Sequence, residues 1–224
     1  MEPDNPLLDD YVLDLARRER SSGRPRVCFL ATASGDAPVY IADFYAAFAR
    51  RSEASHLALF NRSVVDVAEF LVEQDVIYVG GGNTENMLAI WRLHGVDNAL
   101  RRAWEDGVVL TGLSAGSLCW FETGTTDSYG PVLQRLSRGL GFLPGSHSPH
   151  YDAEPKRRPE YHRLVAAGMP GGLAIDDGAA VRFAGTEPVE AVSSRPDARA
   201  YRVELIDGQA IETPLETRYL GAEL

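Results

Sequence analysis

The sequence predicts an α/β fold with a doubly wound, mostly parallel sheet and antiparallel hairpins near the C-terminus. Short apolar runs alternate with segments of helical periodicity through residues 5–120. Glycine or another small residue follows most of these runs, which is typical of the carboxyl ends of parallel strands. After residue 172 the pattern changes to short β-type runs separated by turns. The first two observations predict a sheet with helices on both faces and a functional site along the carboxyl edge of its strands.

Length, charge and cysteine content limit the class of protein. The 224 residues suffice for one domain, residues 1–224, and the 45% hydrophobic and 24% charged content is ordinary for a soluble globular protein. The net charge of −10 argues against a nucleic-acid or anionic-membrane partner. No apolar run reaches transmembrane length, and the acidic N-terminus lacks the apolar region of a signal peptide. Because Cys28 and Cys119 lie in or beside apolar segments, we expect buried thiols and a cytoplasmic protein.

The first half of the chain begins with a predicted helix over residues 5–20. Asp4 or Asn5 can cap this helix, and Pro6 suits its first turn. A doubly wound chain usually opens with a central strand, so either the first strand is missing from this sequence or the sheet is built differently. Strands and helices then alternate. The predicted strands are 27–32, 57–60, 76–79 and 108–110, and the predicted helices are 40–52, 64–73, a helix through 87–93, and a helix that begins with 97–103.

The second half of the chain is predicted to be irregular at first and then rich in β-structure. Residues 123–150 are rich in glycine, serine and proline, which predicts a loop with little regular structure. A helix over 159–167 follows, and the glycine- and proline-containing run 168–172 closes it. The last predicted strands form antiparallel hairpins at one edge of the sheet: 179–183, 189–192, 201–205 and a short strand near Ile211.

Residues 112–116, Gly-Leu-Ser-Ala-Gly, have the G-x-S-x-G pattern of a nucleophile elbow. Glycines two before and two after the serine let a strand turn sharply into a helix, which leaves Ser114 exposed at the carboxyl end of the sheet. The N–H of Ala115 and the N-terminus of the following helix would then face the same spot. The pattern also occurs by chance in many chains. A serine hydrolase therefore needs a base, an acid and further oxyanion donors elsewhere in the sequence.

A base for Ser114 must come from the five histidines. His147 and His150 lie in a loop, residues 145–152, that can approach the elbow. We favour His150, because the fixed backbone of Pro149 presents it. The other histidines are expected to have surface or structural roles: His56, His94 and His162.

The acid can come from either side of His150 in the sequence. The order serine, acid, histidine would use Asp127, thirteen residues after Ser114. Thirteen residues barely hold the helix after the elbow and leave no strand to carry the acid. The order serine, histidine, acid would use Asp177, or its neighbour Asp176, before an apolar strand. We favour Asp177, although an Asp-Asp-Gly run can also be a simple turn.

Residues 80–84, Gly-Gly-Gly-Asn-Thr, follow a predicted strand and open a predicted helix. The run lacks the G-x-G-x-x-G spacing and the Walker lysine of a phosphate-binding loop. The backbone N–H groups of Gly81 and Gly82 would supply a second oxyanion donor beside Ala115, and the alternative is a tight strand-to-helix turn.

The His, Cys and Asp spacing gives no metal-ligand cluster, so the sequence predicts no metal and no cofactor.

Together these motifs resemble the peptidase E family, which includes aspartyl dipeptidases and cyanophycinases. The resemblance rests on residues 80–84, 112–117, 149–151 and 177–178, which occur in the family's order and span most of the chain. It implies a three-layer αβα fold related to class I glutamine amidotransferases, with serine in place of their cysteine. It also implies a triad and an oxyanion hole, which here match Ser114 as nucleophile, His150 as base, Asp177 as acid, and Gly81 or Gly82 with Ala115 as oxyanion hole.

The chain departs from the family pattern in three places. Asp177 stands where the dipeptidases typically have glutamate, so its backbone must lie about one methylene closer to His150. The helix start at residues 85–87 is altered, and family members usually carry an apolar strand and a glycine-rich turn before the segment that begins here at Met1.

Asp127 matches an aspartate in the loop after the family's elbow. Arg157 or Arg158 lies near the position of the arginine that dipeptidases are expected to use for an aspartyl side chain. The predicted substrate-binding residues are therefore Asn83, Thr84, Asp127, Arg157 and Arg158.

We therefore predict a serine peptidase of the exopeptidase type that acts on short peptides. A strict Asp-X aspartyl dipeptidase and a carboxypeptidase-like enzyme are the alternatives within this class. A cyanophycinase is disfavoured, because nothing in the sequence marks a groove for a long polymer. The alternative outside this class is a non-catalytic ligand-binding α/β protein. The sequence leaves open whether the chain forms a homo-oligomer.

Overall fold

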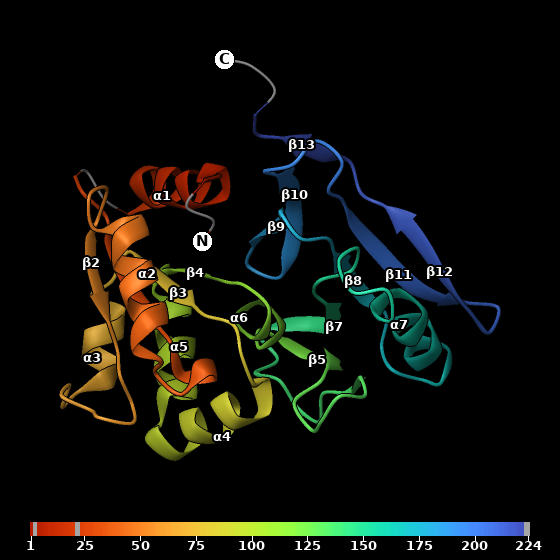
Figure 1. Ribbon diagram of the computed structural model, residues 1–224, viewed down its shortest axis with the longest axis horizontal. Helices are drawn as coiled ribbons and strands as arrows, with labels where there is room; N and C mark the ends of the chain where they lie inside the picture. Colours follow the sequence, from red (N-terminus) through yellow and green to blue (C-terminus); the bar gives the residue numbers. More distant parts are fainter. Residues whose placement is uncertain (2–3, 21–22, 222–224) are drawn as a thin grey trace. The chain divides into compact units, whose positions relative to one another are not determined.

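The first half of the chain forms a parallel sheet with helices on both faces, as its alternating pattern predicts (Figure 1). The computed structural model describes residues 1, 4–20 and 23–221. Contacts within the chain divide it into two compact units, Met1–Ser117 (unit 1) and Leu118–Leu224 (unit 2). The predicted α/β class, with a parallel sheet and antiparallel C-terminal strands, is confirmed. The expectation of a single domain over residues 1–224 stays a prediction.

Unit 1 is built on a four-stranded sheet in which all neighbouring strands are parallel. The strand order is β2-β1-β3-β4, so β1 lies between two partners although a helix precedes it. The strands are β1 (Arg26–Leu30), β2 (Glu53–His56), β3 (Val76–Val79) and β4 (Val109–Gly112). The helices are α1 (Leu7–Glu19), the short 3-10 helix η1 (Thr32–Ser34), α2 (Pro38–Phe48), α3 (Val67–Val72), α4 (Thr84–His94) and α5 (Val96–Glu105).

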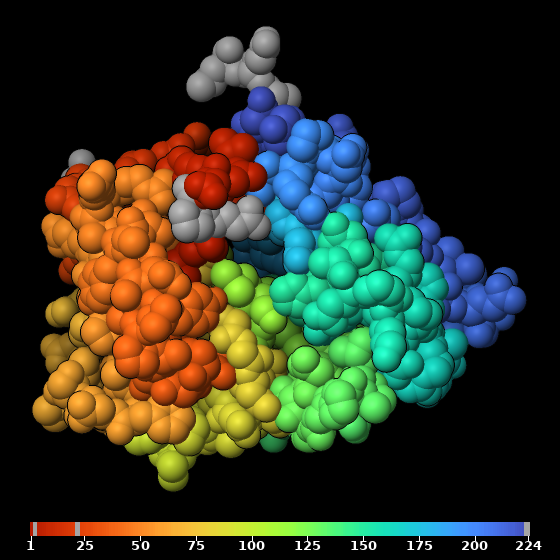
Figure 2. All heavy atoms as spheres, in the orientation of Figure 1, coloured from red at the N-terminus to blue at the C-terminus, as the bar shows by residue number. Residues whose placement is uncertain are grey.

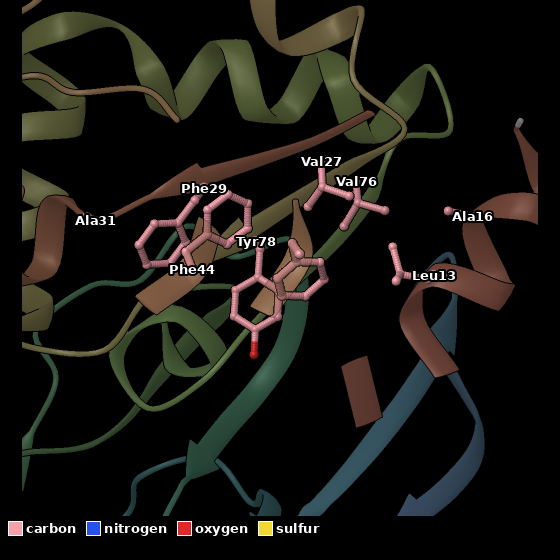
Figure 3. Packing of buried hydrophobic residues seen from close by; sticks show 9 residues of the cluster. Leu13, Ala16, Val27, Phe29, Ala31, Phe44, Val76 and Tyr78 are labelled. Carbon is pink, nitrogen blue, oxygen red and sulfur yellow. The ribbon is translucent and has the colours of Figure 1, made fainter. Parts of the chain in front are cut away.

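Aromatic side chains fill one face of this sheet (Figure 3). Phe29 of β1 stacks on Phe44 of α2 at a ring-centroid distance of 4.8 Å, and Phe44 stacks on Phe48 at 5.1 Å. Leu13 of α1 and Tyr78 of β3 belong to the same buried cluster. Helices α1 and α2 therefore cover this face, and they form part of the surface of unit 1 seen in Figure 2 (red and orange). Helices α4 and α5 lie on the opposite side of the strands (Figures 1 and 3).

The strand predicted over residues 57–60 is wrong. The preceding residues, Glu53–His56, form β2 at the edge of the sheet, where a half-exposed strand needs no apolar run. Leu57 and Leu59 are apolar because they are buried just after this strand ends. The other predicted elements of unit 1 lie within about four residues of the observed bounds.

Unit 2 combines a six-stranded sheet, in the order β12-β11-β8-β7-β5-β6, with a three-stranded sheet, β13-β10-β9. Strands β5, β7 and β8 are parallel neighbours, whereas β8, β11 and β12 pair in antiparallel fashion, as do β9 and β10. The antiparallel hairpins predicted after residue 178 are therefore present. The β11–β12 hairpin lies at an edge of the six-stranded sheet, but the prediction of one common edge is wrong, because β9 and β10 belong to the separate three-stranded sheet. The elements are β5 (Phe121–Thr126), β6 (Gln134–Arg135), β7 (Leu143–Ser148), α7 (Arg157–Ala166), β8 (Gly172–Ile175), β9 (Ala179–Ala184), β10 (Glu187–Ser193), β11 (Ala200–Ile206), β12 (Gln209–Pro214) and β13 (Thr217–Tyr219).

The irregular loop predicted for residues 123–150 is wrong, because this segment contains most of β5 and all of β6 and β7. The buried residues of these strands are largely polar. Thr125 and Ser148 are fully buried, and the Thr125 hydroxyl donates to Ser148 Oγ over 2.7 Å. The Thr123 hydroxyl donates to the carbonyl O of Leu136 over 2.7 Å. Because hydroxyl groups that have hydrogen-bond partners can be buried at little cost, these strands lack the apolar run that marks a buried strand in a sequence.

We expect Phe29→Ala to lower the free energy of unfolding by about 3–5 kcal/mol, because it leaves a cavity in the aromatic cluster of unit 1. Phe29 is fully buried, whereas Phe60 in the same unit is 60% exposed. Phe60→Ala is therefore the matched control and should cost less than about 0.5 kcal/mol. Urea unfolding followed by circular dichroism measures both values. Equal losses in the two variants would contradict this description of the core.

Candidate active site

The predicted nucleophile lies in unit 1, between the end of β4 and the start of α6 (Ala115–Leu118). Ser114 has a φ of +54°, in the left-handed region that residues with a side chain seldom adopt. This conformation costs about 1–2 kcal/mol. A serine held in this way on a strand-to-helix turn has the backbone of a nucleophile elbow.

Close backbone contacts on both sides of Ser114 require glycine. A Cβ on Gly116 would lie 2.1 Å from the carbonyl O of Val79, and a Cβ on Gly112 would lie 2.4 Å from the carbonyl O of Gly116. Ser117 closes the turn, because its N–H and its hydroxyl donate to the Ser114 carbonyl O at 3.0 and 2.8 Å. The G-x-S-x-G spacing therefore has a steric cause in this structure.

The helix after the elbow is shorter than the sequence predicts. Helix α6 has four residues, and strand β5 already begins at Phe121. The thirteen residues up to Asp127 therefore do hold a strand, so the expected lack of one no longer excludes Asp127 as an acid. Because four residues sum to a small dipole, stabilisation of an oxyanion here would rest on individual N–H groups.

The glycine loop after β3 lies beside the elbow within unit 1. Strands β3 and β4 are parallel neighbours, and a Cβ on Gly81 would lie 3.2 Å from Ser114 Cβ. Gly82 has a φ of +136°, and a Cβ there would lie 2.2 Å from the carbonyl O of Ala33. Unit 1 thus brings together the predicted nucleophile and the glycines predicted to bind the oxyanion.

Tyr40 belongs to this cluster, and the sequence pattern did not reveal it. The N–H of Gly81 donates to the Tyr40 hydroxyl over 3.0 Å. Burial raises the pKa of Tyr40, so the hydroxyl keeps its proton. The ring packs edge-on against Phe29 at 5.1 Å. In the sequence Tyr40 reads as part of the apolar face of a helix, and nothing there separates a packing tyrosine from one that also binds the loop.

Asn83 and Thr84, which were predicted to bind substrate, begin helix α4. The Asn83 side chain caps the helix by accepting the N–H of Asn86 at 2.9 Å. Thr84 is buried in the first turn. These contacts give both residues the structural role of a tight strand-to-helix turn, and their contact with substrate stays a prediction.

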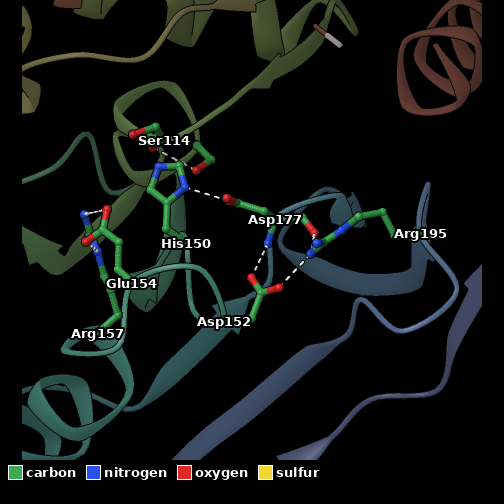
Figure 4. A network of polar contacts seen from close by, with 8 residues as sticks. Ser114, His150, Asp152, Glu154, Arg157, Asp177 and Arg195 are labelled. Atoms are coloured by element: carbon green, nitrogen blue, oxygen red, sulfur yellow. Dashed lines mark hydrogen bonds and ion pairs between the residues drawn. The ribbon is translucent and has the colours of Figure 1, made fainter. Parts of the chain in front are cut away.

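His150 and Asp177, the predicted base and acid, meet in unit 2 (Figure 4). His150 Nδ1 lies 2.6 Å from Asp177 Oδ1. Because an ionised carboxylate can only accept, Nδ1 donates in this contact, which does not engage Nε2. The side chains of His150 and Asp177 are 27% and 43% exposed, so the pair is open to solvent. The sequence therefore identified two residues of unit 2 that are in direct contact.

Asp177 is itself held by Asp152 and Arg195, which the sequence analysis did not identify (Figure 4). The N–H of Asp177 donates to Asp152 Oδ1 at 2.8 Å. Arg195 Nη2 donates to Asp152 Oδ2 at 2.6 Å and also to the carbonyl O of Asp177. Asp152 lies two residues after His150, a proximity that could have drawn attention to it, whereas no comparable pattern marks Arg195.

The alternative base and acids have other surroundings. His147 is buried with Nδ1 3.1 Å from the carbonyl O of Leu173, and burial lowers its pKa to about 4. Asp176 Oδ2 accepts the N–H of Arg199 at 2.9 Å, and burial raises the pKa of this carboxyl. Asp127 is exposed just after β5. Of these candidate acids, it is therefore Asp177 that contacts His150 Nδ1.

Arg157 and Arg158, the candidates for binding a charged end of the substrate, each pair with a carboxylate. Arg157 Nε donates to Glu154 Oε2 at 2.7 Å. Arg158 Nη1 lies 3.6 Å from Glu212 Oε1, and its guanidinium lies over the Tyr151 ring at 4.6 Å. The Arg158 side chain is 46% exposed and that of Arg157 only 4%. Arg158 is therefore the more accessible of the two.

The model of Peptidase family S51 matches residues 1–190, a range that includes the elbow, the glycine loop and the His150–Asp177 pair. The chain belongs to peptidase family S51. It is 50% identical over 223 residues to the uncharacterized peptidase YgaJ of Bacillus subtilis (strain 168), an alignment that covers 99% of this chain and 94% of YgaJ. The resemblance to the peptidase E family is thereby confirmed, and membership of family S51 supports a serine peptidase.

Two solved structures share the fold of this S51 chain. A peptidase from an acI-B1 actinobacterium has a TM-score of 0.66 and 18% identity, and the match covers 94% of this chain and 92% of that one. A Listeria monocytogenes EGD-e protein assigned provisionally to peptidase E has a TM-score of 0.54 and 18% identity, covering 91% and 93%. At 18% identity these similarities show the fold alone.

Within residues 1, 4–20 and 23–221, no helix is long and apolar enough to pass through a lipid bilayer. The same residues hold no group of three or more His, Cys, Asp or Glu side chains that could hold a metal ion. Cys28 and Cys119 are both buried thiols, as their apolar surroundings in the sequence predict.

We expect Ser114→Gly to be more stable than Ser114→Ala by about 1 kcal/mol, because only a residue with a Cβ is strained at this φ. Both variants lack the hydroxyl, so the comparison isolates the backbone conformation. Urea unfolding of the two proteins measures the difference. A glycine variant that is the less stable of the two would show that residue 114 does not need the left-handed region.

His147 should make stability depend on pH. Burial lowers its pKa from 6.5 to about 4, so between these values the unfolded chain binds a proton that the folded chain does not. We therefore expect the free energy of unfolding to fall by on the order of 3 kcal/mol as the pH drops through this range. His147→Gln should show a flatter dependence in urea unfolding between neutral pH and pH 4. Parallel curves for wild type and variant would rule out this role of His147.

Proposed function

We propose that this chain is a serine exopeptidase that hydrolyses short peptides, with Ser114, His150 and Asp177 as its catalytic triad. The 2.6 Å contact between His150 Nδ1 and Asp177 Oδ1 carries the proposal, because it leaves Nε2 available as a base. The left-handed backbone of Ser114 and the membership of family S51 support it.

In the proposed mechanism, Ser114 Oγ attacks the scissile carbonyl carbon while His150 Nε2 takes the hydroxyl proton. Asp177 orients the imidazole and stabilises the imidazolium that forms. The tetrahedral intermediate collapses as His150 gives the proton to the leaving amine. A water molecule then attacks the acyl-enzyme and passes its proton to His150, which returns it to Ser114 as the second product leaves.

Backbone N–H groups of Ala115 and of Gly81 or Gly82 would bind the oxyanion in this mechanism. The Gly81 N–H donates to the Tyr40 hydroxyl, so an oxyanion that binds Gly81 would take over a bond now made to Tyr40. Because a phenol can donate as well as accept, the Tyr40 hydroxyl could then donate to the oxyanion itself.

An arginine would recognise the charged end of the peptide through a charge-assisted pair with a carboxylate. We favour Arg158, since its side chain is 46% exposed, with Arg157 as the alternative. A strict Asp-X dipeptidase would present an aspartyl side chain to this group, and a carboxypeptidase-like enzyme would present a C-terminal carboxylate. Since the two carboxylates are chemically alike, substrate preference has to distinguish these enzymes.

We also propose that the protein works in the cytoplasm without a nucleic-acid or membrane partner. The buried thiols of Cys28 and Cys119 suit a reducing compartment. The net charge of −10 opposes association with polyanions and anionic lipids.

A panel of Asp-X dipeptides, other dipeptides, and longer peptides with free or blocked C-termini tests the proposed activity. We expect the wild type to cleave at least one class and Ser114→Ala to lose at least about 10⁴-fold in kcat/KM. Exclusive cleavage of Asp-X peptides would indicate the narrow dipeptidase, and a requirement for a free C-terminus would indicate the carboxypeptidase-like enzyme. If the folded wild type cleaves no member, the non-catalytic ligand-binding protein becomes the better hypothesis.

The same assay identifies the acid of the triad. Asp177→Asn keeps the shape of the side chain but removes the charge opposite the imidazolium, so we expect kcat to fall by about 10³- to 10⁴-fold. Asp176→Asn is the matched neighbour and should leave kcat close to that of the wild type. A loss of this size in Asp127→Asn, with Asp177→Asn active, would instead make Asp127 the acid.

A further inference from the structure

We propose that Asp152 and Arg195 form a positioning pair that fixes the carboxylate of Asp177 against His150. The inference rests on the proposed function, in which Asp177 orients the catalytic imidazole. All four residues belong to unit 2, and their contacts are drawn in Figure 4.

The pair holds the backbone of Asp177 at both of its polar groups. Asp152 Oδ1 accepts the Asp177 N–H at 2.8 Å, and Arg195 Nη2 donates to the Asp177 carbonyl O. The same Nη2 donates to Asp152 Oδ2 at 2.6 Å, which links the two residues of the positioning pair into one clamp around the Asp177 backbone. The side-chain carboxylate of Asp177 takes no part in these bonds and points to His150 Nδ1.

Asp177 needs such a clamp because it lies on a turn. The N–H of Ala179 donates to the Asp176 carbonyl O at 3.1 Å, and Gly178 has a φ of +76°. The Asp177 side chain is 43% exposed, so packing alone does not fix its rotamer. A Cβ on Gly178 would lie 2.8 Å from Arg195 Nε, which shows that the guanidinium packs directly on this turn.

The length of the acid makes backbone placement more important. Aspartate has one methylene between Cα and the carboxyl group, so a shift of the backbone moves the carboxylate by nearly the same amount. A glutamate could absorb such a shift through its extra torsion angle. A short acid on an exposed turn therefore depends on whatever holds the turn.

The charge of Asp152 is balanced within the clamp itself. Burial by itself would raise the pKa of Asp152, but the Asp177 N–H and the Arg195 guanidinium outweigh this effect and hold the pKa below its usual value. Asp152 is therefore ionised near neutral pH, and Arg195 compensates its charge. Arg195 therefore pairs with Asp152, and the Asp177 carboxylate contacts His150.

A double-mutant cycle in kcat tests the positioning role, using the preferred substrate of the peptide panel. We expect Asp152→Ala to lower kcat by about 10- to 100-fold with little change in KM, because the carboxylate loses its fixed position. Asp152→Asn should recover part of this loss, since its amide oxygen can still accept the Asp177 N–H although its amide nitrogen cannot accept from Arg195. In an Asp177→Ala background, Asp152→Ala should change kcat by less than about threefold, because no carboxylate remains to be positioned.

Controls separate positioning from folding. Asp197→Ala removes an exposed aspartate from the same segment as Arg195 and should leave kcat unchanged. If Asp152→Ala does not fold, Arg195→Ala tests the other half of the clamp and should lower kcat in the same way. Equal losses with and without Asp177, or no loss in either clamp variant, would overturn the positioning role and leave the triad intact. Wild-type kcat in Asp177→Ala would overturn the triad, and the positioning role with it.

Discussion

The register of β3 against β4 is the constraint on which the candidate nucleophile depends. Parallel neighbours end at the same edge of a sheet, and the pairing of Val79 with Gly112 fixes how far each strand runs. The glycine loop and the elbow therefore leave the sheet side by side. Their backbones approach so closely that a Cβ on Gly116 would lie 2.1 Å from the Val79 carbonyl O. The glycines, and the tight turn that places Ser114, follow from the approach of these two strand ends.

The sequence predicts a strand well where the buried side chains are apolar and poorly where they are polar. Strand β3, Val76–Val79, was predicted to the residue because four consecutive buried positions are apolar or aromatic. Strands β5 and β7 were missed because Thr125 and Ser148 satisfy each other across the sheet. A hydroxyl pair between residues 23 positions apart leaves no periodic pattern along the chain. The misplaced strand at 57–60 has the opposite cause, since apolar residues there are buried without pairing in a strand.

The sequence likewise predicts some residues of the candidate site and misses others. His150 and Asp177 could be predicted because side chains meet side chains, and such residue types recur in recognisable motifs. Tyr40, Asp152 and Arg195 act instead on backbone groups, at the N–H of Gly81 and at both polar groups of Asp177. Every residue except proline offers the same backbone N–H and carbonyl. A contact of this kind therefore places no demand on the residue type of its partner. Asp152 and Arg195 do pair through their side chains, but 43 positions separate them in the sequence.

Backbone strain gives an argument for Ser114 that is independent of its motif. In the part of the chain that the structure describes, four residues other than glycine have positive φ: Asp36, Ser114, His150 and Asp207. Aspartate and histidine are enriched in the left-handed region, and Asp207 precedes Gly208 in the two-residue turn between β11 and β12, where such a conformation is expected. Serine has no such preference. A hydroxyl needed only for packing could be supplied from a relaxed backbone, so strain of about 1–2 kcal/mol at this position is best explained by a requirement on where its oxygen lies.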